Sequence, residues 1–135
     1  MGTKLAVTLA GMWLLVAAAP VVAHHSFAAE FDGSKPVTLR GTVTKMEWIN
    51  PHSWLYVAVK GPDGNVQSWA IECGPPNSLL RAGWNKNSLT VGMEVVIDGF
   101  RAKNGTPVAA GRDIKLPDGR KVFVGSGSPD APVDR

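Results

Sequence analysis

The chain has 135 residues, 44% of them hydrophobic, and a net charge of +3 from 14 Lys and Arg against 11 Asp and Glu. This length is enough for one small domain with its own core but not for two. The weak and scattered charge lacks the basic footprint of a nucleic-acid-binding protein, so we expect no nucleic acid among its partners.

Residues 1–23 are typical of a secretory signal peptide. Lys4 supplies a short positive start, Leu5–Ala19 an apolar stretch, and Val21–Ala23 a small-residue exit. We expect cleavage after Ala23, which makes His24 the first residue of a periplasmic or secreted protein. Loss of Lys4 lowers the net charge from +3 to +2.

The alternative for this segment is an uncleaved membrane anchor, because its apolar stretch is long enough for a membrane-spanning helix. A stop-transfer helix usually carries Lys or Arg just past its end. Here Pro20 interrupts the segment and no Lys or Arg stands just past Val22. The sequence therefore favours cleavage and predicts no stable membrane insertion afterwards.

Beyond the signal, residues 24–36 are expected to form an extended lead-in, followed by one β domain over residues 37–124. Turn residues divide that domain into short segments with the period-two alternation of antiparallel strands. The expected strands span residues 37–44, 54–59, 66–73, 93–100, 108–116 and 121–124. Pro62–Asn65 has the composition of a turn, so the second and third strands should form a hairpin.

The third strand should stop at Pro75 and Pro76, because proline has no N–H to donate to a sheet. Asn77 is then expected to cap a short helix that ends at Gly83. Asn104–Gly105 predicts a type I′ hairpin turn later in the chain.

Three strands, a short helix and two more strands follow the order of an OB-fold, a partly open five-stranded barrel. The sequence therefore predicts an all-β, OB-like barrel of five to six strands with one short helix. A β-sandwich is the alternative, but it normally needs about seven strands and no helix at that point. Residues 125–135 are expected to be a disordered tail.

Cys73 is the only cysteine in the chain, so the domain cannot form an internal disulfide. A lone cysteine is most often a small buried hydrophobic residue. The functional alternative is a thiol that pairs with another chain.

The segment between the first two expected strands combines aromatic and polar side chains. Trp48 and Trp54 bracket a turn that contains Asn50 and His52. In an OB-fold this loop and the adjoining strands form the usual ligand surface, where aromatic rings stack on ligands. These four residues are our candidate ligand-binding site.

The competing interpretation of the tryptophans is that they fill the core, since each ring buries on the order of 150 to 250 Å². We expect this core role for Trp69 and Trp84, whereas Trp48 and Trp54 fit either role.

The histidines offer a second hypothesis, a copper site. If His24 is the first residue, its α-amine and imidazole form a chelate that suits Cu(II), and His25 or His52 can add a third nitrogen. Cleavage one residue earlier, before Ala23, would instead permit a square-planar amine, amide and imidazole site. The simpler interpretation is that an exposed His-His pair binds metal unspecifically.

Nucleophilic catalysis would need Cys73 or a serine beside a histidine oriented by a carboxylate. His52 with Glu47 or Glu72 is conceivable, but the sequence has no such local signature, so we expect no enzyme.

Several runs of residues carry a resemblance to a family of small exported bacterial proteins that is known as a domain of unknown function. The runs are Ala23–Phe27, Lys35–Val43, Trp48–His52, Pro76–Trp84 and Leu116–Lys121. The resemblance implies export and a single compact domain. The family as a whole is similar to exported bacterial OB-fold proteins. It implies no activity, and Cys73 is not part of the family's pattern.

Taken together, the residues predict an exported, non-enzymatic OB-like domain without a cofactor. It would bind a small ligand or a protein partner through Trp48, Asn50, His52 and Trp54. The alternative is a periplasmic copper-binding protein that uses His24, His25 and His52.

Overall fold

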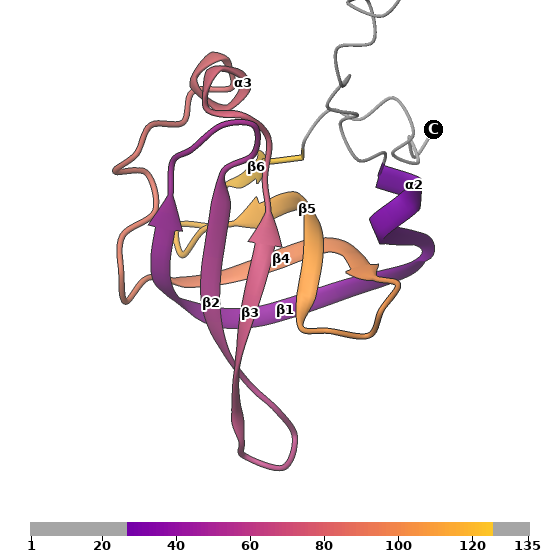
Figure 1. Cartoon of the computed structure of the whole chain (residues 1–135). Coiled ribbons are helices and arrows are strands. Elements are labelled where there is room, and N and C mark those ends of the chain that lie inside the picture. The colour runs from indigo at the N-terminus through magenta and orange to yellow at the C-terminus, as the bar shows by residue number, and fades with distance from the viewer. Residues whose placement is uncertain (1–26, 126–135) are drawn as a thin grey trace, which may run out of the picture.

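The computed structural model describes residues 27–125 of the chain (Figure 1). The described part is mainly β, with one short helix between the third and fourth strands, as predicted. Its elements in chain order are α2 (Phe27–Glu30), β1 (Phe31–Glu47), β2 (Trp54–Lys60), β3 (Val66–Glu72), α3 (Pro76–Arg81), β4 (Glu94–Ala102), β5 (Val108–Lys115) and β6 (Lys121–Phe123).

The strands form a closed ring in the order β1-β2-β3-β5-β4, which returns to β1, and β6 lies outside it against β5. Neighbouring strands are antiparallel except at the closure, where β3 and β5 run parallel and Ala70 pairs with Val108. Closure gives β3 a second neighbour, so β3 is not an open sheet edge, which matters because unpaired edges invite aggregation. The position of α3 between β3 and β4 and the pairing of β2 with β3 agree with the predictions.

β1 is much longer than expected and pairs with both β2 and β4. The lead-in predicted over residues 24–36 therefore overlaps the sheet, because Phe31 pairs with Ala102 and Pro36 with Phe100. The pairing register of β1 with β2 shifts between Val43 and Lys45. Such a bulge bends the strand and helps it to follow a closed ring.

Alternate residues of each strand point into the ring and make the main core. Leu55, Val57, Ile71, Ile97 and Ile114 are almost completely buried there. The predicted core residues Trp69 and Trp84 are also buried. This alternation is the period-two pattern from which the strands were predicted.

A second, smaller cluster lies at the start of β1. Phe31 and Phe100 are buried in it, and Phe27 of α2 packs against them. The rings of Phe27 and Phe100 meet edge to face, with centroids 5.5 Å apart. These contacts explain why the segment from Phe27 onward is ordered against the domain instead of extending away from it.

The start of α3 differs from the prediction. In α3 the N-cap position is Pro75, and no side chain caps the helix. Asn77 was therefore wrongly predicted as the cap, because Pro76 takes the first helical position, for which its fixed φ is suited. The expected end of the helix is correct, since Gly83 has φ +89°.

The Asn104–Gly105 turn is not type I′, since no non-glycine residue in the described part has a positive φ. Only Gly105, with φ +78°, adopts the left-handed conformation. Asn104 instead accepts hydrogen bonds through its side-chain Oδ1 from the backbone N–H and the hydroxyl of Thr106. These two local hydrogen bonds stabilise the turn, and Asn104 does not need the left-handed conformation.

The Pro62–Asn65 turn joins β2 and β3 as predicted. Gly64 has φ +83°, and the Gly61 N–H donates to the Asn65 carbonyl at 2.8 Å. The hairpin projects beyond the rest of the ring (Figure 1).

Several predictions fall outside the described residues. These are the signal peptide over residues 1–23, the histidines His24 and His25, and nearly all of the tail over residues 125–135. Among residues 27–125, no helix is long and apolar enough to cross a membrane.

Candidate functional site

The β1–β2 loop, residues 48–53, is held firmly at its end nearest β2. The Ser53 N–H donates to the Gly74 carbonyl at 3.1 Å, and the Cys73 N–H donates to the Ser53 carbonyl at 2.8 Å. Gly74 in turn donates to the Val124 carbonyl at 2.8 Å. The loop is thereby tied to the segments after β3 and β6, which gives its side chains a fixed platform.

The tip of the loop is open to solvent. Ile49 is 49% exposed, and the next two residues, Asn50 and Pro51, are exposed as well. The Asn50–Pro51 peptide bond is cis. An apolar side chain and an amide therefore stand together on the surface, next to His52.

The two tryptophans that bracket the loop have different environments. Trp48 is half-buried and packs against the main core, so much of its area stabilises the fold. Trp54 is the first residue of β2 and pairs with Glu47 of β1 and Glu72 of β3. Its neighbour Leu55 points into the core, so Trp54 lies on the outer face of the ring between two acidic residues.

His52 contacts one of these acidic residues. Its Nδ1 lies 3.5 Å from Oε1 of Glu72, and the side chains of His52 and Glu72 are 28% and 13% exposed. Nδ1 itself is buried and makes no hydrogen bond within the described part, so the contact is ionic or dipolar. Because Nδ1 faces inward toward a carboxylate, the other ring nitrogen, Nε2, is the one available to a ligand.

A second polar group on the same face was not predicted from the sequence. The Tyr56 hydroxyl donates to Oε2 of Glu47 at 3.0 Å, and Lys45 pairs with the same carboxylate. The lysine is the main cause that lowers the pKa of Glu47, and the tyrosine bond adds to it. Burial, followed by the bond to Glu47, raises the pKa of Tyr56.

The sequence contains a signal for this group that we did not use. Lys45 and Glu47 are two residues apart at the end of β1, so they share a face of the strand. Their alignment with Tyr56 depends on the bulge after Val43, which the alternation pattern does not reveal.

Of the three predicted metal ligands, the structure describes only His52. In the described part, no group of three or more His, Cys, Asp and Glu side chains is placed to hold a metal ion. His52 has Glu72 as its neighbour, and His24 and His25 lie outside the described residues. The described residues thus supply one nitrogen ligand and a carboxylate behind it.

Cys73 is a core residue. It is 1% exposed, and burial raises the pKa of its thiol to about 12. The thiolate is the nucleophilic and metal-binding form of cysteine, so this side chain is unreactive near neutral pH.

These features define the protein by its fold alone. It is a small β domain with a closed ring of strands and a short helix between β3 and β4, and its β1–β2 loop is held by backbone hydrogen bonds and presents polar and apolar groups. Residues 10–111 match a family described as "Family of unknown function (DUF6152)", and the chain belongs to that family. No curated protein and no solved structure matches the chain.

Proposed function

We propose that the protein is an exported, non-enzymatic binding domain whose ligand contacts the β1–β2 loop and the adjoining end of β2. The observation that carries the proposal is the loop's construction. Backbone hydrogen bonds fix it near β2, yet Ile49, Asn50 and Pro51 remain exposed beside His52 and Trp54. A preorganised surface loses little conformational entropy when it binds a partner.

The chemistry of the loop indicates the kind of ligand. Ile49 and the ring of Trp54 offer apolar area, while Asn50 and His52 offer hydrogen bonds. Trp48 supports the loop from beneath through its packing against the core. This mixture suits a small amphipathic molecule or a protein segment.

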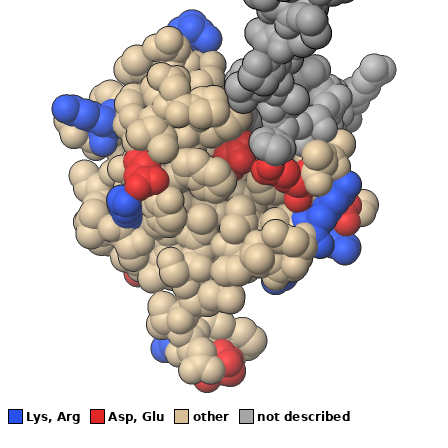
Figure 2. All heavy atoms as spheres, in the orientation of Figure 1, with Lys and Arg blue, Asp and Glu red and all other residues tan. Residues whose placement is uncertain are grey.

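The non-enzymatic part of the proposal is supported by the state of Cys73, because a buried thiol with a raised pKa cannot act as a nucleophile near neutral pH. The exported location, periplasmic or secreted, is supported by the signal sequence over residues 1–23. The expectation of no nucleic acid among its partners is supported by the weak net charge of +3. On the face shown in Figure 2, the Lys and Arg side chains are spread and do not gather into one basic patch.

The test is capture from an extract of the cell envelope with the immobilised mature chain. Trp54→Ala and His52→Ala should each reduce capture at least about tenfold, as expected of residues at the centre of an interface. Lys86→Ala is the matched control, because Lys86 is exposed and lies far along the chain from the loop. Equal capture by all four proteins would contradict the proposal.

Copper binding is the second candidate, and the contact between His52 and Glu72 favours it. Histidine ligands of metals commonly turn their other ring nitrogen toward a carboxylate, which fixes the ring and increases its basicity. Here Nδ1 faces Glu72 at 3.5 Å, which leaves Nε2 for the metal. The amine and imidazole of His24, and the imidazole of His25, would complete the ligand set.

Cu(II) titration of the correctly processed chain tests this candidate. Affinity should fall sharply when one residue is added before His24, because the chelate loses its free amine. His52→Ala should also weaken binding. Equal and micromolar-or-weaker binding by the native and extended chains would exclude the copper site.

A further inference from the structure

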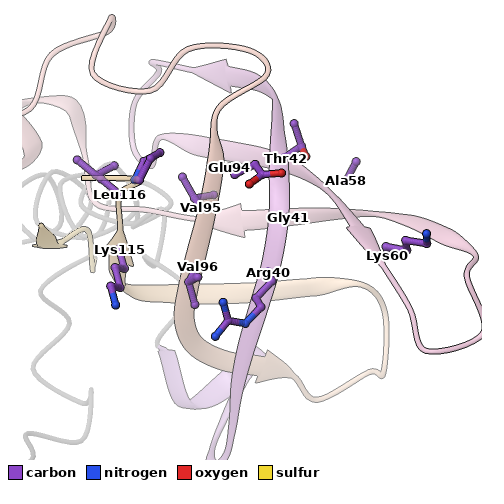
Figure 3. Close-up of a pocket in the computed structure, with 11 residues that line it drawn as sticks. Arg40, Gly41, Thr42, Ala58, Lys60, Glu94, Val95, Val96, Lys115 and Leu116 are labelled. Atoms are coloured by element: carbon purple, nitrogen blue, oxygen red, sulfur yellow. The ribbon is translucent and has the colours of Figure 1, made fainter. Parts of the chain in front are cut away.

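A groove of about 650 Å³ lies on the outer face of the ring, over β1 and its neighbours (Figure 3). This volume is within the usual range for small-molecule sites, roughly 300 to 1,000 Å³. Its floor is built from small residues, Gly41, Thr42 and Ala58. No residue of the β1–β2 loop lines it, so it is a surface separate from the one proposed above.

Three cationic side chains cross the groove in one row. Arg40 pairs with Val96 of β4, and Val96 pairs with Lys115 of β5. On the other side of Arg40, the register of Gly41 with Val59 places Lys60 of β2 in the same row. Figure 3 shows Arg40 and Lys115 on either side of Val96, with Lys60 beyond β1. With strands about 4.8 Å apart, the row extends on the order of 14 Å.

These cations are not neutralised by neighbours. In the described part of the chain, Arg40, Lys60 and Lys115 form no ion pair, whereas Lys45 pairs with Glu47 and Lys121 with Asp98 and Asp113. Glu94 is the carboxylate in the lining, and it stands in the next row, opposite Thr42. The groove therefore has a positive row beside a row that can accept and donate hydrogen bonds.

The shape and lining distinguish between anionic ligands. A compact anion would contact only one end of so long a row. A nucleic acid would find no aromatic ring in the lining on which its bases could stack. A carbohydrate chain with spaced acidic groups and free hydroxyls fits both rows. Val96 and Leu116 offer apolar contact to its sugar rings.

We propose that this groove binds an acidic oligosaccharide laid across β2, β1, β4 and the end of β5. Its carboxylates pair with Arg40, Lys60 and Lys115, and its hydroxyls donate to Glu94 and exchange hydrogen bonds with Thr42. Because the cations are exposed, the binding is salt-dependent and of modest affinity.

Calorimetric titration of the full mature chain with a galacturonate oligosaccharide tests the proposal. Binding should weaken as salt is raised, and Arg40→Gln and Lys115→Gln should each weaken it about three- to tenfold. Lys86→Gln removes the same charge from an exposed site outside the groove and should change binding less than twofold. Thermal melting of each variant excludes loss of the fold as the cause.

Glu94→Gln separates sugar recognition from simple charge attraction. It should weaken binding of the galacturonate oligosaccharide relative to tripolyphosphate. Both anions are freed from the same repelling charge, but only the sugar exchanges a charged hydroxyl acceptor for a weaker neutral one. Three results would overturn the proposal: no binding, equal losses for Lys86→Gln and Lys115→Gln, or tighter binding of tripolyphosphate or an oligodeoxynucleotide than of the oligosaccharide by the native chain.

Discussion

His52 Nδ1 lies 3.5 Å from Glu72 Oε1, and this contact joins the β1–β2 loop to the end of β3. Trp54 pairs with Glu72 across the sheet, so these two side chains lie on the same face. One acidic residue thus faces two of the four side chains predicted to bind a ligand. The contact determines which nitrogen of His52 faces outward.

The first prediction concerns the proton on His52. In the neutral ring it should reside on Nδ1, because the negative carboxylate of Glu72 attracts it there. Nitrogen chemical shifts of the assigned imidazole report the tautomer. Glu72→Gln should move the population toward the Nε2–H form, whereas Glu94→Gln, in the separate groove, should leave it unchanged. An identical tautomer in the native chain and Glu72→Gln would show that the carboxylate does not orient the ring.

The second prediction concerns Tyr56, the only tyrosine of the chain, whose titration can be followed by phenolate absorbance without interference from another tyrosine. Burial and the bond to Glu47 raise its pKa above the ordinary 10.0. Glu47→Gln should lower this pKa only in part, because burial is the larger cause. Full return to the ordinary value would contradict that order of causes.

The same pair predicts how stability depends on pH. The pKa of Glu47 is lowered in the folded protein. Its contribution to the free energy of unfolding is therefore present at pH values above the ordinary pKa of 4.5 and is lost as the pH falls through the folded pKa. The pKa of Tyr56 is raised in the folded protein. Its contribution to the free energy of unfolding is therefore present below pH 10.0 and is lost as the pH rises through the folded pKa. Denaturant midpoints of the native chain and Glu47→Gln should therefore differ more at neutral pH than under acidic conditions.

The third prediction concerns Cys73. Because the thiol is buried and its pKa is about 12, a thiol reagent at neutral pH should label the native protein far more slowly than the unfolded protein. Oxidation should yield no disulfide-linked dimer, as judged by non-reducing electrophoresis. Rapid labelling of the native protein would contradict a core role for this residue.

The fourth prediction concerns the close pairing of β4 with β5. A Cβ at Gly99 would lie 2.2 Å from the Ala110 carbonyl oxygen, a backbone atom that cannot move aside cheaply. Gly99→Ala should therefore destabilise the fold by about 1–3 kcal/mol, the usual cost of overpacking. Urea unfolding measures the loss. Thr44→Ala, at an exposed position of β1, should change stability much less. Equal stability of the two variants would contradict this account of the β4–β5 pairing.

The strand order was predictable because alternation and turn residues are local signals. Leu55 and Val57 alternate with partly exposed residues in β2, and Gly64 and Gly83 stand where the backbone needs a positive φ. Pairing between segments that are distant in the chain produces no such local signal in the sequence. Phe31, at the start of β1, packs in one cluster with Phe100, which lies far along the chain. The local pattern does not show this packing, so the sequence predicted residues 24–36 as an extended lead-in before the β domain.

The candidate site was predictable only in part. The sequence does not distinguish the roles of Trp48 and Trp54. In the structure, Trp48 packs against the main core, whereas Trp54 lies on the outer face of the ring. The row of Arg40, Lys60 and Lys115 was not predicted, because the three residues come from three strands and only the register aligns them.

The most direct test of the central claim is the native mass of the mature protein recovered from its own compartment with bound molecules retained. The account predicts a chain that begins at His24 and carries an additional mass, which the double variant His52→Ala with Trp54→Ala lacks. A chain that still begins at Met1, or a wild-type chain whose bound mass is the same as that of the double variant, would contradict it.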